Sequence, residues 1–491
     1  MISRLDSRSN NVSEYCATQT ETDQLLGNTS KWSESHSVQE LETTWQAEAK
    51  LLTKNAAPLV VTLALQYSLT IASVFSAGNL GSNELAACSL ASMTANITGI
   101  AIYNGLAAAL DTLCSQAYGA GNKILVGVYL QRMAAFLMVL TIPISMVWWN
   151  GEQILRMMIP EPELARLAGL YLRVLAFGMP GHALFECGRR YTQAQGLFRA
   201  PMIVLLITAP LNMLLNYLLV WNSHIGLGFV GAPLAVVISN YCMPFFLFLY
   251  IRFYSGSDCW GGFTRRAFQN WWPMIKLALP GLVMVEAEFL AFEALVLMAS
   301  HISGAHVAAN AIVAQCGSVL WRFSFALSIA TSTRVGIFVG AMAPEAAKTT
   351  ANTSLVLSCI LGCINASILF STRYQIPRLF SKDEHVIAIA AAAMPLVGFF
   401  QIADCIQCVA AGVLRGQGRQ YIGSYVNLVA YYIVALPWSY YTCFFLAWEL
   451  MGLWSGMAIA LALIAVVECF VVLVTNWKRV VGECRARESW A

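Results

Sequence analysis

Long hydrophobic runs alternate with short polar segments along most of this chain. A helix needs about 20 mostly apolar residues to cross a bilayer core about 30 Å thick. Runs of roughly this length lie at residues 55–77, 85–112, 125–148, 163–188, 200–221, 227–251, 274–299, 306–335, 349–371, 386–414, 420–447 and 452–476. We therefore predict an all-α integral membrane protein with twelve transmembrane helices.

The two ends of the chain differ from this hydrophobic body. The first 47 residues are rich in Ser, Thr, Asn, Glu and Gln, so we expect a disordered tail. Met1 is followed by polar residues rather than by the apolar core of a signal peptide, and the first hydrophobic helix should direct insertion. The expected domains are a tail at 1–47, an N-lobe at 48–255, an interlobe linker at 256–272, a C-lobe at 273–478 and a C-terminal tail at 479–491.

The two halves of the chain resemble each other. Pro58 matches Pro280, and LAACSLASM (85–93) matches VAANAIVAQ (307–315), both 222 residues apart. AQGLFR (194–199) matches AAGVLR (410–415) at an offset of 216 residues. Six spans is an even number, so both copies enter from the same side of the membrane. We expect two six-helix lobes related by a pseudo-two-fold axis along the membrane normal, as in secondary transporters with a site between the halves.

Composition agrees with a membrane protein and excludes other classes. Hydrophobic residues make up 58% of the chain and charged residues only 11%, against about 25% charged in soluble domains. The net charge of +3 provides no basic surface for nucleic acid. The chain has no GxxxxGK[ST] phosphate loop, so a nucleotide-driven pump is not expected.

Lys and Arg concentrate in one set of loops, a bias that marks the cytoplasmic side of a membrane protein. The residues of this set are Lys123, Arg189, Arg190, Arg199, Arg265, Arg266, Arg415, Arg419, Lys478 and Arg479. Both termini should therefore face the cytoplasm. The segment ETDQLL (21–26) fits an acidic dileucine sorting signal, and we expect either the plasma membrane or the vacuolar membrane as the location.

Several longer motifs point to a family. They are ALDTLCSQAYGAGN (109–122), LQRM (130–133), GLGFVGAPLA (226–235), EFLAFE (288–293), STRVG (332–336), GVLRGQGRQ (412–420), YYIVALP (431–437) and MGLWSG (451–456). Together they resemble eukaryotic members of the multidrug and toxic compound extrusion (MATE) family. The resemblance runs from about Ala47 to Trp477.

This resemblance implies a proton-coupled exporter of organic cations or amphipathic metabolites. The family's proton-handling acids fall on Glu288, Glu293 and Asp404 of this chain. Bacterial relatives also carry an acid in the first helix, where this chain has Ser73 and where the first span contains no acid. The resemblance therefore places proton coupling in the C-lobe. The internal repeat puts the uncharged Gln66 at the N-lobe position that corresponds to Glu288.

An ionisable residue inside a span is a functional candidate, because burying a charge in the bilayer is costly. A buried carboxyl can hold a proton and release it when water or a cation arrives. A structural carboxyl satisfied by a neighbouring helix is the alternative for each acid. Glu286 shares a helix face with Glu293, whereas Glu288 lies about 140° from Glu293. The family pattern carries no acid at Glu286.

Other polar and aromatic residues receive subsidiary roles. We expect Phe292 and Tyr432 to contribute to the proton and substrate site, where aromatic rings can stack on a cation. For Asp111, Arg132 and Arg415 we expect structural or gating roles. Glu186 should join an ion-pair cluster with Arg189 and Arg190. Glu468 is left with two alternatives, an interlobe contact and a snorkelling group at the surface.

The sequence therefore predicts a monomeric secondary antiporter and not an enzyme. It should exchange protons for organic cations or amphipathic metabolites and should need no cofactor or metal. A lipid-linked saccharide flippase of related architecture and a sodium-coupled exporter are the alternatives. The flippase would be expected to have a cationic central cavity. An integral membrane enzyme would need a compact His/Asp/Glu or Ser/His constellation, which the sequence lacks.

The predicted topology has a consequence for glycosylation. The five N-x-[ST] sequons begin at Asn11, Asn28, Asn96, Asn352 and Asn365. All five should lie in cytoplasmic segments or inside spans, where no oligosaccharide is attached. The protein from eukaryotic cells should therefore show the same gel mobility before and after glycosidase treatment. A glycosidase-sensitive shift would contradict this topology.

Overall fold

The computed structural model describes residues 43–158, 161–222 and 224–488, and Thr44 onward forms one compact unit. Residues 1–42, which include the dileucine segment, lie outside this description. The first helix begins at Trp45, and Thr44 caps it with its hydroxyl at 3.4 Å from the amide of Ala47. Such a cap satisfies an amide that has no partner inside the helix.

The described residues are helical and contain no strand. The N-terminal half contains α2 (Trp45–Gly78), α3 (Ser82–Ala95), η1 (Asn96–Ile100), α4 (Ala101–Ala107), α5 (Ala109–Gly119), α6 (Lys123–Trp149), α7 (Gly151–Met158), α8 (Pro162–Ala176), α9 (Met179–Ala194), α10 (Arg199–Asn216), η2 (Tyr217–Trp221), η3 (Gly228–Val230) and α11 (Gly231–Phe253). Two short 3₁₀ turns, η4 (Ser257–Cys259) and η5 (Arg265–Phe268), follow in the predicted linker.

The C-terminal half repeats the pattern. It contains α12 (Trp271–Ser300), α13 (Gly304–Gly340), α14 (Pro344–Ser371), α15 (Gln375–Phe380), α16 (Glu384–Gln417), α17 (Gln420–Leu428), η6 (Val429–Ala435), α18 (Leu436–Tyr440), η7 (Tyr441–Phe445), α19 (Glu449–Val474) and α20 (Trp477–Glu488). Each of the twelve hydrophobic runs in the sequence falls on one of these helices or on a consecutive series of them. The all-α fold class is confirmed.

Ten of the helical segments in the described part are long and apolar enough to cross a membrane. The two predicted spans outside this set are α12 and the pair α8–α9. Helix α12 carries three glutamates within residues 286–293, and the α8–α9 path is interrupted at Phe177 and Gly178. Both spans therefore carry polar or irregular features that an ordinary lipid-facing helix lacks.

Each half has its own hydrophobic core, but the first helix of each half crosses into the other core. The first half of α2 packs through Leu52 and Leu59 against α13, α14, α16 and α20, whereas Leu69 packs with α9, α10 and α11. Conversely, Met274 and Ala278 at the start of α12 belong to the core of the N-lobe. This reciprocal exchange ties the two lobes together along α2 and α12.

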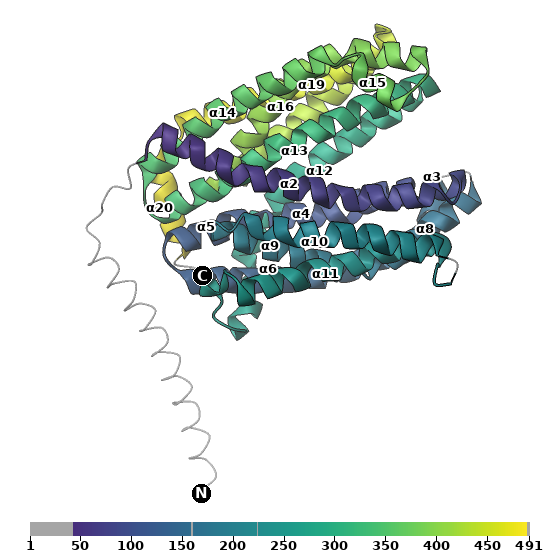
Figure 1. Ribbon diagram of the computed structural model, residues 1–491. Coiled ribbons are helices and arrows are strands. Elements are labelled where there is room, and N and C mark those ends of the chain that lie inside the picture. The colour runs from purple at the N-terminus through teal and green to yellow at the C-terminus, as the bar shows by residue number, and fades with distance from the viewer. Residues whose placement is uncertain (1–42, 159–160, 223, 489–491) are drawn as a thin grey trace, which may run out of the picture. The chain divides into compact units, whose positions relative to one another are not determined.

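The lobes meet most closely at one end, which we call the joined end (residues 105–122, 324–340 and 412–420). There α5 lies against α13 so tightly that a Cβ atom on Gly340 would lie 2.0 Å from the carbonyl oxygen of Gln116. The side chain of Gln116 donates to the carbonyl of Gly416, with a separation of 2.8 Å. Figure 1 shows α5, α20 and the start of α2 at this end, and α3 and α15 at the opposite end of their lobes.

Helix α20 lies across the joined end and contacts both lobes. The Cys484 thiol donates to Gln116 of the N-lobe at 3.3 Å, and Arg487 donates to the carbonyl of Gln417 of the C-lobe at 3.0 Å. Glu483 pairs with Arg419 at 2.9 Å. Partial burial opposes ionisation of Glu483, but the nearby arginines hold its pKa below the ordinary value. The charge on α20 therefore helps to fasten this helix to the bundle.

The tight glycine contact predicts how the joined end can be loosened. Gly340→Ala should overpack the α5–α13 contact, and overpacking typically costs about 1–3 kcal/mol. Because the clash exists only while the lobes touch, residues 109–122 should exchange amide hydrogens faster, as measured by mass spectrometry. Gly304→Ala at the other end of α13 is the control, since nothing lies near that glycine. Equal exchange in both variants would contradict this contact as the restraint.

Candidate functional site

Two of the predicted acids, Glu288 of α12 and Asp404 of α16, lie close enough in the C-lobe for their charges to interact. Glu288 is partly buried on α12, and the charges that act on it are Asp404 and Arg415 of α16. Asp404 is only 2% exposed. One of its oxygens is 3.5 Å from the Gln407 amide nitrogen, and the other has no hydrogen-bond partner in the described part of the chain. A buried carboxylate with so few hydrogen bonds must be neutralised by a proton or by a nearby cation.

Tyr431 of η6 is near enough to these acids for their charges to act on it. It sits in the π-helical turn η6, a type of turn that often occurs at functional sites. Its ring is fully buried, its hydroxyl has no hydrogen-bond partner among the described residues, and the charges of Glu288, Asp404 and Glu468 act on it. The structure therefore places three carboxyls, one guanidinium and one phenol in the same part of the C-lobe.

Glu293 and Glu286 lie elsewhere on α12. Neither has a charged neighbour among the groups that act on it, and each has one buried oxygen without a hydrogen-bond partner within the described ranges. The charge of Glu286 acts on Tyr432, whose hydroxyl lies 3.4 Å from the carbonyl oxygen of Ala287. The structure thus joins Glu288 to Asp404 but does not bring Glu293 into the same charged group.

The aromatic residue predicted for the site, Phe292, belongs to an aromatic cluster in the C-lobe core. Its ring lies edge-on to Phe400 at 6.3 Å and tilted to Trp454 at 6.2 Å. Edge-to-face pairs of this kind add to the stability of a core. In this structure Phe292 therefore packs against α16 and α19 in the C-lobe core.

The N-lobe counterpart of Glu288 has different surroundings. Gln66 on α2 donates to Glu186 at 3.2 Å and accepts from Arg189 at 3.4 Å. Glu186 is fully buried and binds both Arg189, at 2.7 Å, and Arg190. Asp111 completes the network, 3.4 Å from Arg190. Two acids therefore face two arginines, and this network carries no net charge.

Of the residues predicted as structural or gating groups, Arg132 binds the interlobe linker and Arg415 binds at the joined end. Arg132 donates to the carbonyl of Arg266 in the linker at 3.1 Å. Arg415 donates from its side chain to Ser328 at 2.7 Å, while its backbone carbonyl accepts a hydrogen bond from Thr112 of the N-lobe. The side chain of Arg415 faces the C-lobe acids and its backbone contacts the other lobe, so this one residue connects the acids to the joined end.

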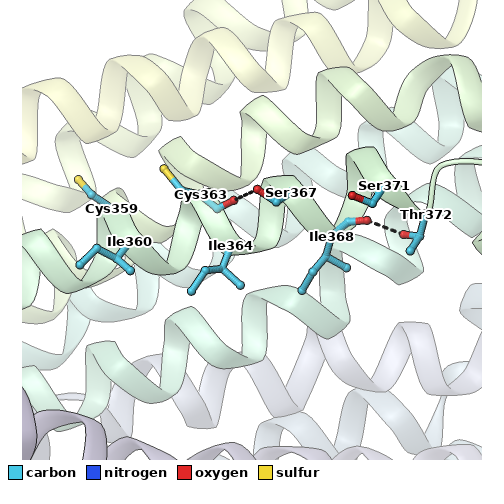
Figure 2. A pocket seen from close by; sticks show the side chains of 8 residues that line it. All are labelled: Cys359, Ile360, Cys363, Ile364, Ser367, Ile368, Ser371 and Thr372. Carbon is cyan, nitrogen blue, oxygen red and sulfur yellow. Dashed lines mark hydrogen bonds between the residues drawn. The ribbon is translucent and has the colours of Figure 1, made fainter.

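The hydrophobic groove of about 670 Å³ on the surface of α14 is separate from these acids. Its lining is Cys359, Ile360, Cys363, Ile364, Ser367, Ile368, Ser371 and Thr372. Figure 2 shows that these residues follow one another along α14, with the three isoleucines projecting to one side. The lining contains no ionisable acid, and most of it is exposed, as expected for a surface that faces lipid. Among the described residues no group of His, Cys, Asp and Glu has the arrangement of a metal site.

Glu468 had no predicted place in the acidic group. Tyr431 and Tyr432 are both candidates for stacking on a cation, and the charges of the acids act on Tyr431. Glu468 was visible as a lone acid in the apolar run AVVECFVV, but helical periodicity alone could not say what α19 would place beside it. Ser73, at the position where bacterial relatives carry an acid, is buried and lies 3.4 Å from the Leu69 carbonyl.

Comparisons with known proteins agree with this geometry. The sequence model of the MatE family matches the chain twice, at residues 58–218 and 280–441. The second match begins 222 residues after the first, which confirms the internal repeat. The solved structure of the eukaryotic MATE transporter AtDTX14 has a TM-score of 0.85 and 28% identity, and the match covers 91% of this chain and 100% of that one. Two six-helix lobes, the architecture of such transporters, are thereby confirmed.

Curated relatives extend the likeness to sequence. An uncharacterized transporter of Saccharomyces cerevisiae is 43% identical over 437 residues, which cover 89% of this chain and 63% of the yeast protein. The chain thus spans less than two thirds of that relative's length. An uncharacterized transporter of Schizosaccharomyces pombe is 41% identical, with 89% of this chain and 81% of that protein covered. Multidrug and toxin extrusion protein 2 of Mus musculus is 31% identical, with 90% and 77% covered.

The N-lobe network makes a prediction about stability. Glu186→Gln keeps the side-chain shape but leaves two buried arginines with Asp111 as their only acid in this network. Removing one partner of a buried ion pair typically costs about 3–5 kcal/mol. The melting temperature of the purified protein should therefore fall clearly. Glu163→Gln is the control, because its pair with Arg166 is exposed and such pairs stabilise weakly. Equal melting temperatures for the two variants would contradict a structural role for the network.

Proposed function

This chain belongs to the MatE family of multidrug and toxic compound extrusion transporters, and we propose that it is an antiporter that exports organic cations or amphipathic metabolites in exchange for protons. It is a multi-pass membrane transporter and not an enzyme. The coupling ion and the substrate class are the parts that this proposal adds.

One observation carries the proposal, namely that Glu288 and Asp404 share the C-lobe interior with a single arginine. Two ionised carboxylates against Arg415 leave one negative charge uncompensated in a region of low dielectric. Either one proton or one monovalent cation removes this imbalance. Proton and organic cation therefore compete for the same carboxylates, and competition for one site is what an exchanger requires.

The N-lobe supports the placement of coupling in the C-lobe. At the position related to Glu288 by the repeat, Gln66 has no charge, and the acids nearby are already paired with Arg189 and Arg190. A balanced network of this kind has no reason to gain or lose a proton during a transport cycle. The lobes share one scaffold, but among the described residues the uncompensated acid pair lies in the C-lobe.

The joined end suggests how binding is linked to movement. Arg415 faces the acids with its side chain and contacts Thr112 of the other lobe through its backbone. When the acids exchange a proton for a cation, the net charge stays the same but its distribution around Arg415 changes, because the proton neutralises one carboxyl whereas the cation leaves both carboxylates ionised. We propose that this change alters the packing at residues 412–420 and lets the lobes rock between two states.

The charge distribution favours one orientation in the membrane. Lys123, Arg265 and Arg419 belong to the joined end or to the loops next to it, and basic loops mark the cytoplasmic side. The start of α2 and α20 also lie at this end (Figure 1). We propose that the joined end faces the cytoplasm, with both termini on that side, in the plasma membrane or the vacuolar membrane.

The alternative functions make different demands on the same site. A saccharide flippase would use a cationic site, whereas the C-lobe acids outnumber their one arginine. A sodium-coupled exporter would place Na⁺ on the oxygens of Glu288 and Asp404, and the oxygen of Asp404 that lacks a partner suits either ion. Proton and sodium coupling are therefore distinguished by which imposed ion gradient drives efflux.

The test is ethidium efflux from vesicles that contain the purified full chain under an imposed pH gradient. Glu288→Gln should lower proton-driven efflux by about ten-fold or more, because the amide cannot exchange a proton. Asp404→Asn should act similarly, and Glu293→Gln should also impair efflux. Glu286→Gln is the matched control on the same helix and should have a smaller effect.

All variants are compared at equal protein content and with protein-free vesicles. Wild-type efflux in Glu288→Gln would remove the basis of this mechanism. Loss of efflux in Glu286→Gln alone would mean that the other face of α12 carries the coupling. Efflux that follows an imposed sodium gradient and ignores the pH gradient would replace proton coupling by sodium coupling.

A further inference from the structure

Glu468 is the least explained charged residue of the C-lobe. It lies in α19, is 0% exposed, and neither of its carboxylate oxygens has a hydrogen-bond partner among the residues that the structure describes. Buried polar groups in folded proteins nearly always have a partner. A carboxyl that serves only to hold helices together would be expected to accept hydrogen bonds from them, and Glu468 accepts none in the described part of the chain.

The groups around Glu468 come from four other helical segments of the C-lobe, namely α12, α16, α17 and η6. The charges that act on it are Arg415 of α16 and Glu288 of α12, and its own charge acts on Tyr431 of η6. On α17, a Cβ atom added to Gly423 would lie 3.0 Å from one Glu468 oxygen, so the carboxyl reaches the backbone of that helix. The side chain therefore points into the acidic group and away from lipid.

Charge counting shows what Glu468 adds. With Glu288 and Asp404 alone, one proton makes the group neutral in the presence of Arg415. With Glu468 included, three carboxylates face one guanidinium, and a second proton is needed. Arg415 forms no ion pair with Glu468 within 4 Å, and its side chain donates to Ser328. Arg415 therefore acts on Glu288 and Glu468 from a distance and forms a close ion pair with neither of them.

We propose that Glu468 is a third proton-binding carboxyl of the C-lobe site, so that the site holds two protons instead of one. The inference concerns the site named in the proposed function and rests on that function only for its role in exchange. Because Glu468 and Glu288 repel when both are ionised, the three acids share their protons and titrate as one coupled set over a broad pH range.

The proposal is tested first without transport. Protonated carboxyl groups absorb infrared light at a carbonyl stretch that ionised carboxylates lack, and this absorption is measured on the purified full chain from acidic to alkaline pH. Glu468→Gln should remove the absorption of about one carboxyl at neutral pH and should narrow the pH range over which the remainder disappears. Glu345→Gln is the control, because Glu345 is exposed at the start of α14.

A neutral isostere should be tolerated at this position, because the proposed resting form of Glu468 is itself neutral. The melting temperature of Glu468→Gln should therefore equal or exceed that of the wild type. Glu468→Leu serves as a second variant, since it removes the proton site and any hydrogen bond together. Failure of both variants to fold would overturn the proposal, because it would show that an ionised or hydrogen-bonded carboxyl supports the structure.

The vesicle assay separates this inference from the proposed function. Glu468→Gln should still exchange ethidium for protons, but over a narrower pH range than the wild type. Unchanged infrared absorption in Glu468→Gln would overturn the role of Glu468, whatever the vesicles show. If that absorption is lost while wild-type vesicles show no proton-driven efflux, the proposed function fails and Glu468 remains a proton-binding residue.

Discussion

The interior of the C-lobe contains more carboxyl groups than cationic groups, and the function of this structure depends on that excess of acids. Three carboxyls from α12, α16 and α19 lie in one part of the C-lobe, where Arg415 acts on Glu288 and Glu468 and where Asp404 and Glu468 are buried. Moving an ion from water into such a region costs several kcal/mol unless compensating charges or hydrogen bonds are present. Asp404 and Glu468 retain oxygens without hydrogen-bond partners among the described residues. The fold therefore maintains acids that protons or cations must neutralise, and this need gives the site its capacity for exchange.

The two lobes show how one scaffold supports two electrostatic solutions. In the N-lobe, Glu186 and Asp111 are matched by two arginines, and Gln66 adds hydrogen bonds without charge. This network stabilises α9 against α2. In the C-lobe, Arg415 donates to Ser328 rather than pairing with an acid, and Asp404 and Glu468 keep oxygens without partners among the described residues. The paired acids of the N-lobe stabilise the fold, whereas the unpaired acids of the C-lobe can bind ions. The helices of the two lobes nevertheless follow the same order.

The connection between site and movement runs through a small number of contacts. Arg415 belongs to the acidic group by its side chain and to the interlobe contact by its backbone. The close approach of α5 and α13 depends on glycines such as Gly340, because any side chain there would meet the facing backbone. The exchange of α2 and α12 between the cores, together with α20 across the joined end, holds the lobes together while leaving this contact free to change.

The sequence by itself determined the twelve spans, the internal repeat and the family, because hydrophobic length, repeat spacing and motifs are properties of the chain alone. It also singled out Glu288 and Asp404, through the resemblance of their motifs to the family. Only the tertiary structure decided that Glu468 and Tyr431 lie with them, that Glu293 stands apart, and that α2 and α12 cross between the cores. Helical periodicity tells which residues share one face of a helix. It does not tell how that helix is rotated against its neighbours, and this rotation decides which buried charges meet.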